Sequence, residues 1–293
     1  MIYSSSIIKK GKLCRSEYDN LIFDKIKIID TEGLIYAFYE RTGITGNVSF
    51  PELTSIGDHG LESAFDGCTG ITSVSFPKLT SVNTNGLTYA FTDCTGIKGN
   101  VSFPKLSNIG GVNGLSYAFS KCTGINGSVS FPELTSISTG GLSYAFDRCT
   151  NITGSISFPK LTSIGSKGLY NTFYRCTSIT GTVSFPELTS VGEYGLSYAF
   201  RGCTSITGSV SFPKLISIDY SGLSYAFREC TGITSVSFPK LTSIDRTGLS
   251  NAFNGCTGIT KIHFRADAQS TVEATSGYSS KFGATNATIY FDL

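Results

Sequence analysis

Apolar residues recur along the chain in one pattern that repeats from unit to unit. Within a unit the pattern is Ile-x-x-Val-x-Phe-Pro-x-Leu-x-x-Ile, as at Ile71, Val74, Phe76, Leu79 and Val82. The Val-Ser-Phe step alternates with a period of two, so Val and Phe lie on one face of a short strand and Ser lies on the other. The proline that follows has no N–H group and therefore ends the strand.

The repeat has a nearly constant length, which the phenylalanine of its "AF" step makes visible. Successive copies are 26 to 28 residues apart. The nine copies are Phe38, Phe65, Phe91, Phe119, Phe146, Phe173, Phe200, Phe227 and Phe253. A strand that returns in the same direction at this interval pairs with its neighbours only as a parallel sheet, so the chain must coil. The segment "GLSYAF" begins with a turn-forming Gly and continues with helix formers, which predicts one or two helical turns.

These patterns predict one leucine-rich solenoid of about nine repeats, with a parallel β-sheet on one face and short helical or irregular turns on the other. The repeat array is predicted over residues 33–264. Residues 1–32, with a degenerate half-repeat that includes Cys14, are expected to form an N-terminal cap, and residues 265–293 a C-terminal cap. Caps are expected because a bare terminal coil would expose an unpaired strand edge.

Cysteines follow the same period, three residues after the repeat phenylalanine, with Arg41 in that place in the first copy. They are Cys68, Cys94, Cys122, Cys149, Cys176, Cys203, Cys230 and Cys256. Side chains in register on parallel coils stand about one strand spacing apart, which is wider than a disulfide prefers. No C-x-x-C pair suggests zinc. We interpret the row as small core residues with free thiols.

Composition narrows the function classes. Hydrophobic residues make up 40% and charged residues 15%, which describes a folded protein. The formal net charge of +2 predicts no general affinity for nucleic acid, and no apolar run is long enough to insert into a membrane. The N-terminal stretch offers no secretory apolar region.

The units "AF..C" and "IT.VSFP.LTSI" resemble the BspA-like (Treponema pallidum type) leucine-rich repeats over roughly residues 22–264, and "FGATNATIYF" is similar to the way such arrays end. The resemblance implies a repeat scaffold. It also implies an extracellular or cell-surface location and, as in several members, adhesion to host proteins or to other cells. Similar arrays in tail or attachment proteins of bacterial viruses imply an alternative, a structural or assembly module.

Catalysis is not expected, because a near-perfect repeat offers one residue many times rather than different residues at one place. No nucleophile elbow, phosphate-binding loop or metal-binding motif occurs, so we predict no catalytic residue, no metal and no cofactor. The two histidines are His59, expected to be solvated in a turn, and His263, expected to be an exposed substitution in a strand.

Two rows are candidate ligand-binding residues. Tyrosines two residues before the repeat phenylalanine are either packing between coils or binding anchors. They are Tyr89, Tyr117, Tyr144, Tyr198 and Tyr225, with Tyr36 in the first copy and with Ser63, Asn171 and Asn251 as interruptions. Basic residues after the repeat phenylalanine could align as a cationic strip, although tolerance of any polar residue explains the same variation. They are Lys121, Arg148, Arg175, Arg201 and Arg228.

Two further rows, of strand serines and of Glu or Lys after the prolines, also have structural interpretations. The strand serines are either a polar coat for the sheet or a hydroxyl track for glycan or peptide, and a Glu/Lys row after the prolines keeps one edge soluble. Together the rows predict a non-catalytic scaffold that makes several weak contacts with an extended protein or glycan on a cell or host surface.

Overall fold

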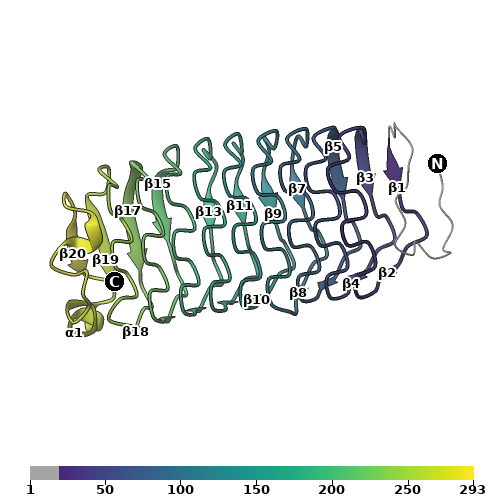
Figure 1. Cartoon of the computed structure of the whole chain (residues 1–293). Coiled ribbons are helices and arrows are strands. Elements are labelled where there is room, and N and C mark those ends of the chain that lie inside the picture. The colour runs from purple at the N-terminus through teal and green to yellow at the C-terminus, as the bar shows by residue number, and fades with distance from the viewer. Residues whose placement is uncertain (1–19) are drawn as a thin grey trace.

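The chain coils into an elongated solenoid in the computed structural model, which describes residues 20–293. Successive coils lie side by side from one end of the molecule to the other (Figure 1). We number the coils 1 to 9 by their repeat phenylalanine, from Phe38 to Phe253. The predicted parallel solenoid is confirmed, whereas Cys14 lies outside the described residues.

The Val-Ser-Phe segments form the first side, named sheet B here, and every pairing in it is parallel. Its hydrogen-bonded groups follow in chain order. The first is β1 (Leu21–Ile22), β3 (Gly46–Ser49) and β5 (Ile71–Ser75). The second is β7 (Val101–Ser102), β9 (Val129–Ser130), β11 (Ile156–Ser157) and β13 (Val183–Ser184). The third is β15 (Thr207–Ser211), β17 (Gly232–Phe238), β19 (Lys261–Phe264) and β20 (Thr288–Phe291).

A second strand in each coil forms sheet A, which the pattern did not predict. The nine members are two residues long and are also parallel. They are β2 (Ile28–Ile29), β4 (Ser55–Ile56), β6 (Ser81–Val82), β8 (Asn108–Ile109), β10 (Ser136–Ile137), β12 (Ser163–Ile164), β14 (Ser190–Val191), β16 (Ser217–Ile218) and β18 (Ser243–Ile244). Between the two strands the Phe-Pro-x-Leu corner is a turn, in which the Leu134 N–H bonds the Phe131 carbonyl at 3.4 Å.

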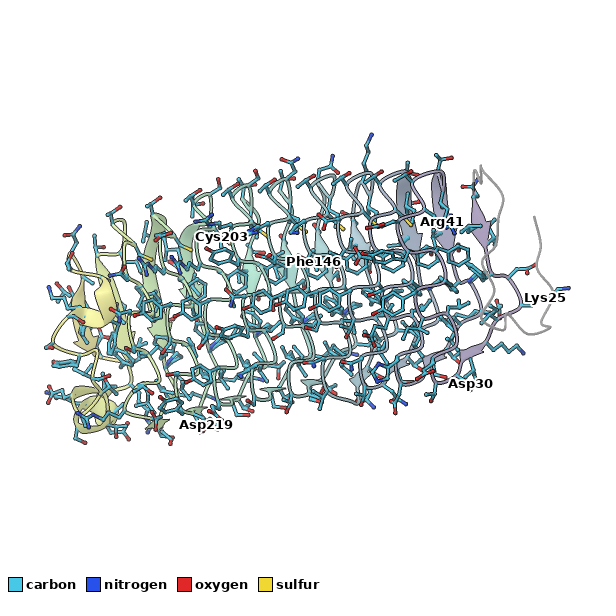
Figure 2. All side chains as sticks on the ribbon, viewed as in Figure 1. Lys25, Asp30, Arg41, Phe146, Cys203 and Asp219 are labelled. Carbon is cyan, nitrogen blue, oxygen red and sulfur yellow. The ribbon has the colours of Figure 1, made fainter. Side chains whose placement is uncertain are left out.

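Two columns of stacked phenylalanine rings fill the interior. Strand and turn phenylalanines each stack on their equivalents in the next coil, mostly about 5.3 Å apart, as for Phe131–Phe158 and Phe173–Phe200. The columns touch edge to face, as at Phe103 and Phe119. Figure 2 shows the rings in line along the axis, with Phe146 labelled. Because each coil buries its rings against its neighbours only, the core is continuous along the rod.

The residues after the array fold against the last coil. They include η1 (Ala266–Ala268), α1 (Gln269–Glu273) and η2 (Lys281–Gly283). β20 adds a strand to sheet B beside β19, and α1 contacts β18 at the end of sheet A. Both sheet edges at this end are therefore partly covered.

Candidate functional site

The third side of the solenoid, named the turn face here, is built by the "GLSYAF" segments and the two residues after them. It contains no helix, so the predicted helical turns are wrong and the irregular alternative holds. Every second amide bonds the next coil, as Tyr117 N–H does to the Ser143 carbonyl at 2.9 Å. The amides between them close tight turns within their own coil, as Ala118 N–H does to Leu115. The bonds between coils explain why helix propensity does not prevail here.

This backbone takes a positive φ at every fourth residue. In coil 5 the three residues are Gly140, Tyr144 and Arg148, with φ of 66°, 56° and 56°. Equivalent residues in coils 1 to 8 share the sign, so the predicted tyrosines and the basic residues Lys121, Arg148 and Arg175 lie in two of the three left-handed rows of this face. In coils 7 and 8 Gly202 and Glu229 take the left-handed position, one residue after Arg201 and Arg228. Most side chains in these rows are half-buried or exposed, whereas Ser63, Asn171 and Ser221 are buried.

The predicted tyrosine row consists of rings stacked on one another. Tyr117 lies 4.7 Å from Tyr89 and 4.5 Å from Tyr144 between ring centroids, and Tyr198 lies 4.9 Å from Tyr225. The packing interpretation is therefore confirmed for the ring faces, and the anchor interpretation stays a prediction. Ring faces are used for stacking between coils, whereas the ring edges and hydroxyl groups remain at the surface.

Tyr170, which the spacing did not select, fills the interruption at Asn171. Its ring meets Tyr144 edge-on at 5.5 Å and Tyr198 edge-on at 5.8 Å. The row is thus continuous over six coils, from Tyr89 to Tyr225. The only sequence signal was a tyrosine one position before an unexpected asparagine.

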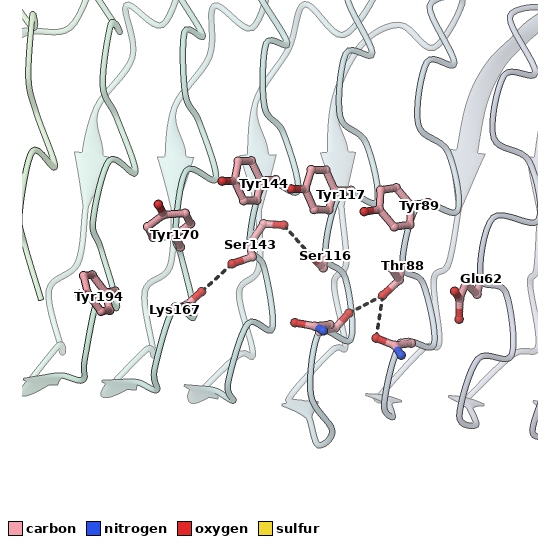
Figure 3. Close-up of a pocket in the computed structure, with 12 residues that line it drawn as sticks. Glu62, Thr88, Tyr89, Ser116, Tyr117, Ser143, Tyr144, Lys167, Tyr170 and Tyr194 are labelled. Atoms are coloured by element: carbon pink, nitrogen blue, oxygen red, sulfur yellow. Dashed lines mark hydrogen bonds between the residues drawn. The ribbon is translucent and has the colours of Figure 1, made fainter.

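An open groove of about 730 Å³ runs from coil 2 to coil 7 along the first part of the tyrosine row, and Tyr198 and Tyr225 lie outside it (Figure 3). Its lining residues are Glu62, Asn85, Thr88, Tyr89, Asn113, Ser116, Tyr117, Ser143, Tyr144, Lys167, Tyr170 and Tyr194. Hydroxyls on its floor bond carbonyls of the next coil, at 2.6 Å from Thr88 to Asn113 and 2.8 Å from Ser143 to Lys167. These bonds fix the floor, so the groove is preformed.

The chemistry of the groove is mainly that of neutral hydrogen-bonding groups. Burial raises the pKa of the Tyr89, Tyr117 and Tyr144 hydroxyls, which therefore stay protonated at neutral pH. Lys167 lies near the ring of Tyr194, with Nζ 5.9 Å from the centroid. Phenol and amide groups in a row suit the hydroxyl and carbonyl groups of an extended polymer.

The five predicted basic residues do not form one row. Lys121, Arg148 and Arg175 are second after the repeat phenylalanine, whereas Arg201 and Arg228 are first after it. The first three are exposed, and the other two are half-buried. The structure thus brings the five together on one edge of the turn face, with a one-residue step between coils 6 and 7.

Aromatic rings lie beside three of the four arginines in the strip. The guanidinium of Arg175 lies 5.3 Å from the ring centroid of Tyr174, and that of Arg201 lies 5.6 Å from the same centroid. Arg228 lies 5.7 Å from the centroid of Tyr225. Cation–π contacts of this kind contribute about 0.5–1 kcal/mol each at exposed sites and favour these positions of the guanidinium groups.

Acidic neighbours offset part of the positive charge. Lys121 Nζ is 3.4 Å from Asp93, and Glu229 is 3.1 Å from Arg228 Nε and 3.9 Å from Arg201. The strip is therefore less cationic than its sequence suggests.

The two histidines lie at opposite ends of the array. His59 contacts Glu62, and His263 contacts Asp292 at 2.8 Å and stacks on Tyr290. His263 is thus covered by β20 rather than left exposed at the end of the sheet. Among residues 20–293 no cluster of three or more His, Cys, Asp or Glu side chains is placed to hold a metal ion. Within the same residues, no helix has the length and apolar character to cross a membrane.

The remaining rows lie on other sides of the coil. The strand serines are outward and half-buried or exposed. The Glu/Lys row pairs between coils, at 2.7 Å for Lys78–Glu52, 2.8 Å for Lys160–Glu133 and 2.6 Å for Lys214–Glu187. A smaller groove of about 400 Å³ along the serine row is lined by Ser184 and Ser211, and no aromatic residue is among its lining residues.

Comparison with known proteins gives one family. The model of the BspA type leucine rich repeat region matches residues 27–171, 88–217, 115–248 and 169–282. None of the curated protein sequences compared with the chain matches it.

Among solved structures, one shares the fold at a TM-score above 0.5, and two others are more distantly similar. A leucine-rich repeat protein from Bacteroides ovatus superposes with a TM-score of 0.51 at 17% identity, over 94% of this chain and 69% of that one. A leucine-rich repeat protein from Treponema pallidum has a TM-score of 0.38 at 19% identity, over 64% of this chain and 78% of that one. A leucine-rich cell surface protein from Faecalibacterium prausnitzii has a TM-score of 0.36 at 12% identity, over 94% of this chain and 87% of that one.

Proposed function

This chain belongs to the BspA-type leucine-rich repeat family, and we propose on that premise that it is a non-catalytic binding scaffold whose turn face engages an extended partner. The groove along the tyrosine row carries the proposal. It is long and preformed, and neutral hydrogen-bonding groups make up most of its lining, with Glu62 and Lys167 as the charged members. The tyrosines of coils 3 to 6 repeat one type of contact along it. Such a surface binds by the sum of several weak, evenly spaced contacts.

The partner that this groove fits is a protein segment or a glycan. Faces of the stacked tyrosine rings are covered by their neighbours, so hydroxyl groups and ring edges make the contacts. Six coils at a repeat of about 4.8 Å provide roughly 24 Å between the first and the last, which accommodates about seven residues of extended peptide. We propose adhesion at a cell or host surface as the setting, on the strength of the family.

A binding measurement with tyrosine variants tests this function. Immobilised glycans and extracellular matrix proteins are probed with the wild-type chain and with the double variant Tyr117→Asn, Tyr144→Asn. Asparagine already occupies this position at Asn171 and Asn251 with the same sign of φ, so the coil accepts it. We expect binding to any probe that retains the wild type to weaken by tenfold or more, roughly the loss of one hot-spot contact.

The matched control is Ser130→Ala with Ser157→Ala on sheet B, which removes hydroxyls from two adjacent coils away from the groove. It should bind like the wild type. Equal binding by the tyrosine double variant would exclude the groove as the binding site. No retention on any probe would count against adhesion itself.

A further inference from the structure

Charges of opposite sign lie at the two ends of the turn face. Counting the two residues after each repeat phenylalanine, coils 1 to 8 carry −1, −1, −1, +1, 0, +1, +1 and 0. The negative coils contain Glu40, Asp66 and Asp93, and the later positive coils contain Arg175 and Arg201. The basic strip is therefore one end of a bipolar row.

Both ends carry charge that the chain itself does not fully compensate. At the acidic end Asp66 is half-buried near Asp93 and Glu40, and Lys121 is the cation that opposes them. At the basic end Arg175 lies over the ring of Tyr174, and Arg201 and Arg228 share the single carboxylate of Glu229, at 3.9 Å and 3.1 Å. Each end thus retains capacity for an external charge of the opposite sign.

The order of the charges is self-complementary. A twofold axis across the turn face, placed between coils 4 and 5, sets coil n of one copy opposite coil 9 − n of a second copy. Asp66 in coil 2 then faces Arg201 in coil 7, and Asp93 in coil 3 faces Arg175 in coil 6. Because a twofold interface is isologous, each pairing occurs twice. The tyrosine row lies over its own counterpart, with Tyr117 and Tyr144 nearest to the axis.

We propose that the turn face is an interface between two antiparallel copies of this chain. A uniformly anionic polymer laid along the same row fits less well, since it would be repelled by Glu40, Asp66 and Asp93 at one end. A second copy, in contrast, places its basic coils against the acidic end and its acidic coils against the basic end. The contact is expected to be reversible, because exposed ion pairs contribute little each and are screened by salt.

Charge reversal at Asp93 and Arg175 tests the proposal on the full chain. Both side chains are outward and take the same backbone conformation, with φ of 55° and 57°. The reversals Asp93→Arg and Arg175→Asp each introduce a residue that another coil already carries at this position, so folding is preserved. Sedimentation velocity over a concentration series at about 0.05 M and about 0.5 M NaCl measures the association, since the Debye length falls about threefold between them.

We expect a dimer at low salt that dissociates at high salt. Each single reversal should weaken association by about tenfold, because two pairs per dimer become repulsive. A chain with both reversals should associate like the wild type, and so should an equimolar mixture of the two single variants. The control Lys105→Glu changes the charge by the same amount on another side and should have no effect.

A wild-type chain that stays monomeric at low salt would overturn the proposal, as would a dimer that the single reversals leave intact. This inference goes beyond the binding function and does not depend on it. A dimer would cover the groove, so partner binding is compared in about 0.5 M NaCl, where screening separates the copies. At this salt concentration the tyrosine variants measure partner binding, whereas the charge variants measure dimerisation in the low-salt sedimentation experiment.

Discussion

The repeat places equivalent residues of successive coils next to one another, and the cysteines show how such a row satisfies buried backbone groups. The thiol of Cys149 lies 3.0 Å from the Phe119 carbonyl, and all eight described cysteines donate to the repeat phenylalanine of the preceding copy. Burial raises the pKa of Cys68 to about 12, so its thiol stays protonated. The row therefore satisfies buried carbonyls and is chemically inert.

Asp66 makes a pH-dependent contribution to stability. Burial, followed by the like charges of Asp93 and Glu40, raises its pKa to about 6. The pKa in the unfolded chain is about 3.9, so the folded protein holds this proton more tightly. The stabilisation is complete below about pH 4 and is lost as the pH rises through 6.

We expect Asp66→Asn to raise the free energy of unfolding by about 1 kcal/mol at pH 8, after allowance for solvent screening at this half-exposed site. The gain should disappear at pH 4. Urea denaturation at low protein concentration and several pH values measures it. The exposed control Asp219→Asn should show no such gain, and a gain for Asp66→Asn that is equal at both pH values would contradict the assignment.

At the scale of the strand, one inserted glycine decides how neighbouring coils meet. Units of the "ITGSVSF" type contain it, whereas "ITSVSF" units do not. At Gly181 an added Cβ would lie 2.5 Å from backbone atoms of Gly154 and Ser155, so only glycine permits this approach. Gly208, at the equivalent position in the next coil, has φ of 81° and no atom within 4 Å of an added Cβ.

The two glycines should therefore respond differently to alanine. We expect Gly181→Ala to destabilise the protein by about 2–4 kcal/mol, because the backbone of the neighbouring coil has to move. Gly208→Ala should cost about 1 kcal/mol, the cost of a left-handed conformation for a residue with a Cβ. Thermal unfolding of the two variants compares them, and equal losses would show that local conformation rather than contact between coils sets the cost.

Several elements could be predicted from the sequence because a period of two or of 27 residues marks them. The Val-Ser-Phe strands, the proline corners and the cysteine row are of this kind. Sheet A was missed because a two-residue strand has no period of its own, and the helical turns were wrong because bonds to the next coil override local propensity. The tyrosine and basic rows of the candidate site could be predicted from their spacing in the sequence. The groove, the place of Tyr170 in the row and the ion-pair partners of each charge could not, because they depend on contacts between coils.

Over the whole molecule, coils depend on their neighbours and hardly on distant parts of the chain. This predicts that one full unit can be removed. Deletion of residues 150–176 joins Cys149 to Thr177, which follows Cys176 as Thr150 follows Cys149. We expect a folded, shorter solenoid whose urea m-value falls by about a tenth, in proportion to the surface lost. Circular dichroism and urea denaturation test this.

The control deletion, residues 150–162, removes about half a unit and puts sheet, turn and corner positions out of register. It should not unfold cooperatively. Cooperative unfolding of both shortened chains would show that register between coils is not what holds the solenoid together.

Sheet B is interrupted twice, between β5 and β7 and between β13 and β15. At the second interruption the rings of Phe185 and Phe212 stand 6.0 Å apart. At the first, Phe76 and Phe103 are 5.7 Å apart, and the Lys98 N–H still bonds the Thr72 carbonyl at 2.9 Å. Backbone hydrogen bonds of sheet A and the turn face still join the two coils at the second interruption, as from the Arg175 N–H to the Arg201 carbonyl at 2.8 Å. The Lys214–Glu187 ion pair at 2.6 Å adds an exposed side-chain contact. A rod pulled from its ends yields first at its weakest junction. Under tension the molecule should therefore rupture between coils 6 and 7, into two stacks that each keep their own aromatic core.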